Sequence, residues 1–440
     1  MFKWTIYNLL FAVVWPFLLP GFLLRMLRRG GYAARMGDRI GLYPDEVLAA
    51  LGAKPDSHDF RKGEFVWIHA VSVGEVQVAG QLMREWRQSE PTVRFCFSTT
   101  SSTGWKMAGR EVTARDVLVY NPLDFPAFVR SALRTVRPRA IVLTESEIWP
   151  NFIRKAHRYG IPLFLINARV SDRSAPRYRA ARWFFRDVLG AFTAVFAQSE
   201  LDRERLLAAG ASAATVRVTG SFKFDVALRR PEKERELAAW LFPDGRRRAG
   251  ERILLGGSTW PGEDEVLIAA YARLRERHPG LRLVLAPRHF EKADAVEANV
   301  RRAGFACVRR SREGAPGAGA APGAVCLADT TGELMGLYGL ADVVFVGKSL
   351  CARGAQNMIE PCLCGKPTLV GPHTENFRPV MSDLLEAKAI EQVPDAEALT
   401  ARLDALLRDD GGLGERAAAA VGRRRGVVPK CVAAMREALK

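Results

Sequence analysis

The sequence lacks the features of a disulfide-stabilised protein and of the common zinc sites. Its seven cysteines are an odd number without a Cys-x-x-Cys pair, at positions 96, 307, 326, 351, 362, 364 and 431. Cys362 and Cys364, with Cys351 nearby, have no second pair and no histidine at the spacing that zinc sites use. We therefore expect free thiols in a reducing compartment and no bound metal ion.

Two nucleotide-binding fingerprints are also missing. No Gly-x-Gly-x-x-Gly stretch follows a predicted strand, which argues against a dinucleotide-dependent oxidoreductase. Gly347-Lys348-Ser349 is similar to the end of a Walker loop, but Asp342 stands where that loop requires its first glycine. The sequence thus predicts no organic cofactor, and any nucleotide must be held in another way.

Negative charge is in short supply. The 440 residues include 65 Lys and Arg against 48 Asp and Glu, which leaves a formal charge of +17. This surplus suggests an anionic partner, namely nucleic acid, acidic lipid or a phosphorylated substrate, although arginine can also simply keep a surface soluble. The composition is otherwise globular, with 48% hydrophobic residues, and the length predicts two domains.

Charge is absent altogether from residues 4–24, a stretch of ~20 apolar and aromatic residues that could cross a bilayer. Pro16 and Pro20 should interrupt its helix, and arginines follow it at positions 25, 28, 29, 35 and 39. A cleaved signal peptide would carry its charges in front instead. We therefore expect residues 1–30 to attach the protein to the cytoplasmic face of a membrane, either by spanning it or by lying in its interface; a buried core helix is the alternative.

The rest of the chain alternates short apolar runs with amphipathic stretches, which predicts βα units and mostly parallel sheets. Strands are expected at EFVWIHAVSV, VRFCFSTT, AIVLTES, IPLFLINA, AVFAQS and VRVTGS, and again at RILLGGST, LRLVLAPRH, FACVRRS, AVCLADT, DVVFVGKS and PTLVG. Residues 227–250 break the rhythm. The pattern predicts an α/β protein with a Rossmann-like domain at 31–226, a linker at 227–250 and a second Rossmann-like domain at 251–440, with a cleft between them.

Two strand ends in the first half carry carboxylates. Glu75 follows a strand and a glycine turn at the start of a helix, where it could accept a proton from an attacking hydroxyl or merely complement the helix dipole. Glu145 and Glu147 follow another strand, and alternation would point both in the same direction, so either could face a ligand. Lys223 could reach a phosphate as a point charge, or could be a solvated surface lysine.

Three connections in the second half have the chemistry to hold a nucleotide sugar. They are Pro287-Arg288-His289, the turn of Thr331, Gly332 and Glu333, and the stretch of Asn357, Met358, Ile359 and Glu360. A guanidinium and helix N-terminal amides suit phosphate, and a carboxylate accepts hydrogen bonds from ribose hydroxyls.

Taken in order along the chain, these segments resemble the motifs of the Kdo (3-deoxy-D-manno-octulosonic acid) transferases of lipopolysaccharide synthesis. The resemblance also includes Asn167-Ala168-Arg169, Gly257-Ser258-Thr259, Gly371-Pro372-His373-Thr374 and the Arg-x-Gly-Asp-Arg stretch at 35–39. It covers nearly the entire chain.

The resemblance implies a glycosyltransferase B fold and an inverting enzyme that needs no metal, in keeping with the lack of any Asp-x-Asp pair. Kdo would pass from CMP-Kdo to a lipid A precursor, lipid IVA, at the cytoplasmic side of the inner membrane of a Gram-negative cell. Glu75 would accept the proton, and Glu145 and Lys223 would assist at the transition state. The residues at 287, 288, 331–333 and 357–360 would hold CMP.

The chain departs from the family pattern in one loop. The family has Gly-Gly-Ser followed by Gly-Gly-His-Asn-Pro-Leu-Glu-Pro, whereas this chain has Gly347-Lys348-Ser349 followed by Gly354-Ala355-Gln356-Asn357-Met358-Ile359-Glu360-Pro361. Asn357 and Glu360 remain, but the family histidine is replaced by Gln356. Gln356 keeps a neutral hydrogen bond but cannot become cationic. One alternative is an enzyme of the same fold that uses another activated sugar or acceptor. Another is a membrane-bound nucleic-acid-binding protein, but no nucleic-acid module is present, so we expect no such partner.

Overall fold

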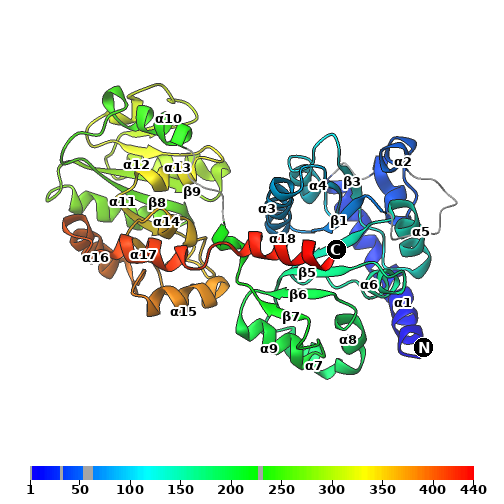
Figure 1. Ribbon diagram of the computed structural model, residues 1–440. Helices are drawn as coiled ribbons and strands as arrows, with labels where there is room; N and C mark the ends of the chain where they lie inside the picture. Colours follow the sequence, from blue (N-terminus) through cyan, green and yellow to red (C-terminus); the bar gives the residue numbers. More distant parts are fainter. Residues whose placement is uncertain (1, 30–32, 53–62, 226–230) are drawn as a thin grey trace. The chain divides into compact units, whose positions relative to one another are not determined.

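A computed structural model describes residues 2–29, 33–52, 63–225 and 231–440 of the chain. Figure 1 shows two compact units, which comprise Met1–Asp225 together with Gly426–Lys440, and Val226–Arg425. Each unit has its own parallel sheet covered by helices, so the predicted pair of Rossmann-like domains is confirmed. All seven cysteines are free.

The first unit contains a seven-stranded parallel sheet in the order β3-β2-β1-β4-β5-β6-β7. Its strands are β1 (Phe65–His69), β2 (Arg94–Thr99), β3 (Val117–Tyr120), β4 (Ala140–Thr144), β5 (Leu163–Ala168), β6 (Ala194–Ala197) and β7 (Val216–Val218). The chain leaves β1 in one direction for β2 and later returns to its other side for β4, so the strand order reverses between β1 and β4. Ligands of open α/β sheets bind at such reversal points, beyond the carboxyl ends of the strands.

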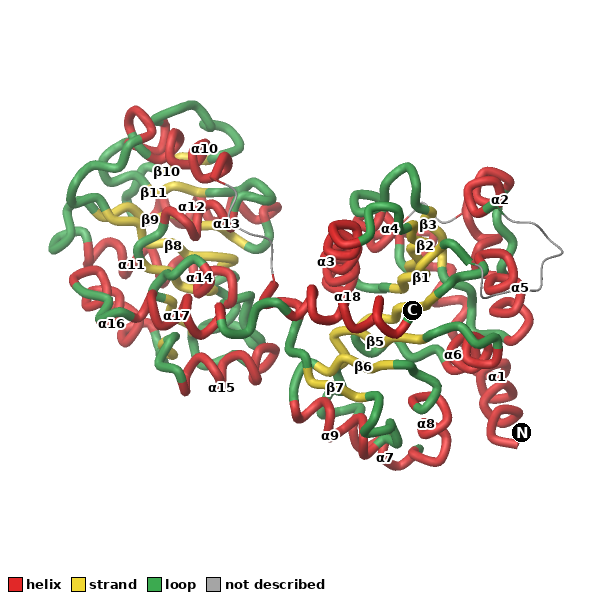
Figure 2. Tube along the Cα trace, viewed as in Figure 1, coloured by secondary structure: helices red, strands yellow, loops and turns green. Residues whose placement is uncertain are grey.

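Helices cover both faces of this sheet (Figure 2). One apolar core lies under α3 (Val73–Ser89) and α18 (Val427–Ala438), where Trp86 is fully buried. The core of the other face lies under α5 (Pro126–Val136), α6 (Pro150–Arg158), α8 (Arg182–Leu189) and α9 (Glu200–Ala208). The remaining helical segments are α1 (Phe2–Arg29), η1 (Ala33–Ile40), α2 (Asp45–Leu51), α4 (Ser102–Ala108), α7 (Ala175–Ala180) and η3 (Phe222–Asp225).

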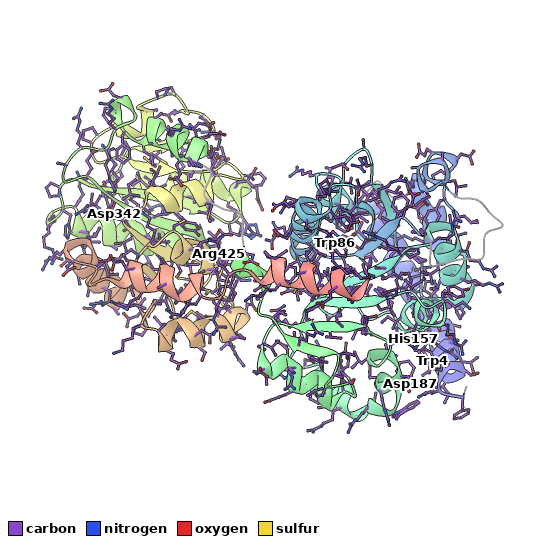
Figure 3. The ribbon with its side chains drawn as sticks, in the orientation of Figure 1. Trp4, Trp86, His157, Asp187, Asp342 and Arg425 are labelled. Atoms are coloured by element: carbon purple, nitrogen blue, oxygen red, sulfur yellow. The ribbon has the colours of Figure 1, made fainter. Side chains whose placement is uncertain are left out.

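Helix α1 differs from the segment expected at the N-terminus. It continues through Pro16 and Pro20 without a break. Helix α1 packs on α6 and α8, near Trp4, His157 and Asp187, which Figure 3 labels. Trp4 is buried there against Phe184 of α8. Asn8 accepts a hydrogen bond from Asn151, and the Tyr7 hydroxyl donates one to Asp124. Among the residues that the structure describes, no helix has the length and apolarity to cross a membrane, and the expected spanning anchor is not supported.

The second unit contains another seven-stranded parallel sheet, in the order β10-β11-β9-β8-β12-β13-β14. Its strands are β8 (Arg252–Thr259), β9 (Leu281–Pro287), β10 (Cys307–Arg309), β11 (Val325–Leu327), β12 (Val343–Val346), β13 (Thr368–Val370) and β14 (Glu391–Gln392). Here the strand order reverses between β8 and β12. The carboxyl ends of those two strands therefore form the expected ligand position of this unit.

The helices of the second unit include residues that the sequence suggested as a linker. Leu237 and Trp240 of α10 (Pro231–Leu241) are fully buried, and α10 packs on α13 (Leu334–Leu340), so it is part of the unit. Helices α11 (Glu263–Leu274), α12 (Ala293–Arg302) and α16 (Ala396–Arg408) share one apolar core. The remaining helical segments are η4 (Pro243–Gly245), η5 (Phe290–Lys292), η6 (Ala318–Ala320), α14 (Ile359–Leu363), η7 (Glu375–Phe377), α15 (Arg378–Glu386) and α17 (Leu413–Gly422).

The last helix, α18, belongs to the first unit, although the sequence alone placed it with the second. Val428, Cys431, Val432 and Met435 are buried in the core beside α3. At the start of α18, the Asp225 carboxylate accepts hydrogen bonds from the amides of Gly426 and Val428, both at 2.6 Å. Arg425, labelled in Figure 3, is the last residue of the second unit.

Candidate functional site

Glu75 lies at the reversal point of the first sheet, in the first turn of α3 directly after β1. The Ser72 hydroxyl caps this helix by accepting a hydrogen bond from the Glu75 amide. Glu75 is 8% exposed as a residue, and its Oε2 accepts hydrogen bonds from the Val71 amide at 3.1 Å and the Thr144 hydroxyl at 3.0 Å. Its Oε1 has no donor among the described residues. One oxygen is thus held in place, and the other can accept a proton.

Glu145 follows the neighbouring strand β4 and lies close enough to Glu75 to be affected by its charge. Burial, in the first place, and the Glu75 carboxylate raise the pKa of Glu145 above its usual value. Its backbone is in the left-handed region, with a φ of 50°, which is uncommon for a residue other than glycine. Strained backbone of this kind is concentrated at functional sites.

Asn167, at the end of β5, links Glu145 to the turn that carries Lys223. Its Nδ2 donates a hydrogen bond to Glu145 Oε1 at 3.2 Å, and its Oδ1 accepts one from the Phe222 amide at 3.1 Å. Asn167 is fully buried, and its φ of 52° is also left-handed. An amide side chain suits this position because its nitrogen donates to the carboxylate while its separate oxygen accepts from the backbone amide.

Lys223 completes this cluster from the short helix η3. Burial lowers the pKa of Lys223, the Glu145 carboxylate opposes that effect, and Arg169 adds to it. The exposed Arg169 is held at the same place because its amide donates to the Glu145 carbonyl at 3.3 Å. The structure therefore brings together the three predicted catalytic residues, with two carboxylates and two cations at one end of one sheet.

Glu147 is separate from this cluster, contrary to the alternation argument. Strand β4 ends at Thr144, and a turn follows in which the Glu147 amide donates to the Thr144 carbonyl. Strand alternation therefore does not apply. Glu147 Oε2 accepts a hydrogen bond from the Trp149 indole at 3.0 Å and lies 3.7 Å from His69 Nε2. Glu147 thus holds Trp149 and the buried His69.

The reversal point of the second sheet is organised around Glu263, which sequence reasoning missed. This fully buried carboxylate accepts hydrogen bonds from the amides of Trp260, Lys348, Ser349 and Leu350 at 2.7–2.9 Å, with a longer one from Cys351. The amides after Gly347 are therefore bound by the protein itself and are not a Walker-type phosphate nest. An acidic residue in the first helical turn after Gly257-Ser258-Thr259 was the available signal, but all of its partners except Trp260 are 85–88 residues away.

Glycines allow this loop to pack closely. A Cβ on Gly347 would lie 2.4 Å from the Ser258 carbonyl oxygen, and one on Gly371 would lie 2.2 Å from the Ser349 carbonyl oxygen. Such contacts would displace backbone, so both positions require glycine. The Ser349 hydroxyl also accepts a hydrogen bond from the Gly371 amide, which joins the ends of β12 and β13.

Arg288 follows β9 at this same end of the sheet, as predicted. Its amide donates to the Thr259 carbonyl at 3.0 Å, and its exposed guanidinium exerts a favourable charge effect on Glu360. Burial is the larger effect and leaves the pKa of Glu360 raised. Asn357 donates to Glu360 Oε1 at 3.0 Å, whereas Met358 and Ile359 are fully buried and could offer a ligand only their backbone.

The turn at residues 331–333 has two exposed residues and one buried side chain. Thr331 and Gly332 are exposed, and Gly332 has a φ of 84°. The Glu333 side chain is buried and forms ion pairs with Lys233 and Arg310 at 3.0 and 3.3 Å. Burial raises the pKa of Glu333. Hydrogen bonds from Thr330, Arg310 and Lys233 together outweigh burial, so the net effect is a lowered pKa. Glu333 fixes the turn, and the two exposed residues remain open to a ligand.

Comparison with solved structures defines the class. A glycosyltransferase from Rickettsia africae is 13% identical and covers 86% of this chain and 99% of its own, with a TM-score of 0.55. A UDP-GlcNAc 2-epimerase from Neisseria meningitidis, solved with UDP-GlcNAc, is 14% identical, with 80% and 94% coverage and a TM-score of 0.56. At these identities the likeness shows the fold, which is that of the glycosyltransferase B class.

Sequence comparison then gives the family. The profile described as 3-Deoxy-D-manno-octulosonic-acid transferase (kdotransferase) matches residues 34–226. The 3-deoxy-D-manno-octulosonic acid transferase of Haemophilus influenzae is 30% identical over 91% of this chain and 90% of its own length. That of Bordetella pertussis is 37% identical over 75% and 76%. The chain belongs to the Kdo transferase family, the glycosyltransferases of lipopolysaccharide synthesis, and the predicted membership is confirmed.

Proposed function

We propose that this chain transfers Kdo from CMP-Kdo to a hydroxyl group of a lipid A precursor, with inversion and without a metal ion. The observation that carries the proposal is the Glu75 carboxylate, which has one oxygen bound and one available, beside Glu145 and Lys223 in a member of the Kdo transferase family. The acceptor oxygen forms a bond to the anomeric carbon of Kdo. The bond from that carbon to the phosphate of CMP breaks, and the hydroxyl proton passes to Glu75 Oε1.

The neighbours of Glu75 favour this direction of proton transfer. Because hydrogen bonds from Val71 and Thr144 hold Oε2, the carboxylate cannot rotate away from the acceptor. The raised pKa of Glu145 favours its protonated form, which lessens repulsion when Glu75 is ionised. Lys223 and Arg169 offer positive charge to the anionic substrates.

CMP is bound by the second unit in this proposal. The exposed Arg288 guanidinium approaches its phosphate, the 331–332 turn offers backbone groups, and Glu360 accepts hydrogen bonds from the ribose. Pro287 and the Asn357–Glu360 segment shape this position, with Met358 and Ile359 acting through their backbone.

Helix α1 attaches the enzyme to the cytoplasmic face of the inner membrane by lying in the interface. One side of α1 packs on the first unit. The other presents Phe2, Leu9, Leu10, Val13, Val14 and Phe17, which are 47–81% exposed. Burial, in the first place, and the positive charges of four nearby arginines lower the pKa of Lys155; these are Arg130, Arg158, Arg134 and Arg154. The five cations therefore lie together. The Arg154 guanidinium lies 4.3 Å from the ring centroid of Trp4 in α1, which places the cluster beside this helix. An apolar ridge beside a cationic cluster suits an anionic lipid surface.

The activity is tested by incubating the full chain with CMP-Kdo and lipid IVA and measuring the lipid by mass spectrometry. A mass gain of one or more Kdo units is expected, with the same rate in the presence of a chelator. Transfer from another activated sugar, but not from CMP-Kdo, would favour the alternative of a different glycosyltransferase.

The membrane attachment is tested by flotation with anionic phospholipid vesicles. Replacing Leu10 and Phe17 by Gln is expected to release the protein, whereas Leu201→Gln, at an exposed position of α9, should leave it bound. Equal flotation of all three proteins would assign the docking to another surface.

A further inference from the structure

Lys348 is a cation at the reversal point of the second sheet that the proposed mechanism does not use. It directly follows Gly347 at the end of β12, and its backbone φ of 57° is left-handed. A glycine would adopt this conformation without strain, so the lysine side chain is present at a cost to stability. Strain that is retained at a ligand-binding end of a sheet indicates a use for the side chain.

The Lys348 backbone has no freedom to relax this strain. Its amide donates to Glu263 Oε2 at 2.7 Å, and its carbonyl accepts from the Ala355 amide at 2.8 Å. The next hydrogen bond, from the Gln356 amide to the Gly347 carbonyl at 3.0 Å, closes the loop. Two of the departures from the family pattern, Lys348 and Gln356, therefore lie side by side in one hydrogen-bonded loop.

The Lys348 side chain is held by an aromatic ring and not by an acid. Its Nζ lies 4.9 Å from the centroid of Trp260, and the His289 ring also packs on Trp260, with 4.7 Å between the ring centroids. Among the described residues, no carboxylate pairs with the Lys348 ammonium group. A cation–π contact positions a charge without neutralising it.

We propose that Lys348 binds an anionic group of the sugar-nucleotide donor, together with Arg288. Arg288 directly follows β9 and precedes His289, and its amide is bound to the carbonyl of Thr259, the residue before Trp260, so the Arg288 backbone and the Lys348 ammonium group lie at the same aromatic pair. A point charge such as an ammonium group suits either a phosphate or the carboxylate of an ulosonic acid. The proposal deepens the donor binding proposed above and rests on it.

The experiment compares four full-length variants by calorimetric titration with CMP and by transfer kinetics with CMP-Kdo. Lys348→Gly removes the charge and the strain, Lys348→Gln removes the charge alone, and Lys348→Arg keeps the charge. Lys388→Gly is the matched control because Lys388 is an exposed lysine of the same unit with a left-handed φ of 49°.

If the anion is the phosphate, Lys348→Gly and Lys348→Gln weaken CMP binding about tenfold, Lys348→Arg weakens it less, and Lys388→Gly stays within twofold of wild type. The loss should shrink at high salt, and cytidine binding should not change. If the anion is the sugar carboxylate, CMP affinity is unchanged and the KM for CMP-Kdo rises about tenfold. CMP affinity and KM both within twofold of wild type would overturn the proposal. A wild-type protein that binds no CMP would instead overturn the proposed function.

Discussion

The two sheets use carboxylates at their reversal points in opposite ways. In the first unit, one oxygen of Glu75 has no donor in the part of the chain that the structure describes, and Glu145 has a raised pKa. In the second unit, Glu263 is saturated by backbone amides, and Glu333 is ion-paired with a lowered pKa. The contrast agrees with the proposed roles, in which an acid with incomplete hydrogen bonds takes part in chemistry and an acid with complete hydrogen bonds stabilises the structure.

The largest expected effect comes from removing the structural acid. Glu263→Ala leaves several buried amides without an acceptor, so we expect the protein to lose about 3–5 kcal/mol of unfolding free energy and its CMP binding. Urea denaturation and CMP titration measure the two losses. Glu265→Ala, at an exposed position of the same helix, is the control, and an equally small effect of both variants would contradict the role of Glu263.

Glu75→Gln should have the reverse profile. The amide oxygen can still accept from Val71 and Thr144, so folding and CMP affinity should be kept, while transfer falls by at least ~100-fold because the general base is lost. The rate is measured by lipid mass spectrometry, with Glu85→Gln on the same helix as the control. A rate near that of wild type would remove Glu75 from the mechanism.

A variant of Asn167 tests whether Glu145 must be held in position by its hydrogen bond from this residue. Asn167→Ala removes a hydrogen bond that lowers the pKa of Glu145, so that pKa should rise further, and transfer should fall about tenfold. The pH profile of the rate should move toward higher pH, which a purely structural role would not cause. CMP affinity reports on the other unit and should be unchanged.

The smallest effects are opposite slopes of stability against pH. The folded protein holds the Glu145 proton more tightly than the unfolded chain, so this residue lowers stability as pH rises through its raised pKa. Glu333 adds stability above its usual pKa, which is lost as pH falls through its lowered pKa. At pH 8, Glu145→Gln should therefore resist urea better than wild type and Glu333→Gln less well. A change in urea stability of the same sign in both variants would contradict the contrast between Glu145 and Glu333.

Local pattern was enough to predict most of the fold. All twelve predicted strands are present, because each is an apolar run bounded by turn residues. Strand β14 was missed because it has only two residues and β3 because Val117–Tyr120 is short and follows a polar loop. The proline argument failed for α1 because Phe11 and Trp15, just before Pro16, pack on Phe125 of the first unit and support the helix.

The site was predictable to the extent that its residues follow strands. Glu75, Glu145 and Arg288 do so, and the family resemblance added their roles. Glu263, Asn167 and Lys348 gain their importance from partners 55–88 residues away, such as Phe222 and Cys351, and no local pattern reports those pairs. The raised pKa of Glu145 likewise depends on burial and on Glu75, which only the fold brings close.

The position of α18 has a consequence for synthesis of the protein. Val428, Cys431 and Met435 fill the core beside β1 and α3, yet they are translated after the whole of the second unit. Until they emerge from the ribosome, the first unit has an open apolar face, although the rest of its chain was completed about 200 residues earlier. The second unit is contiguous and can fold first. The second unit can therefore complete its core before the first, and removal of Gly426–Lys440 would damage the unit that carries Glu75 while leaving the second unit complete.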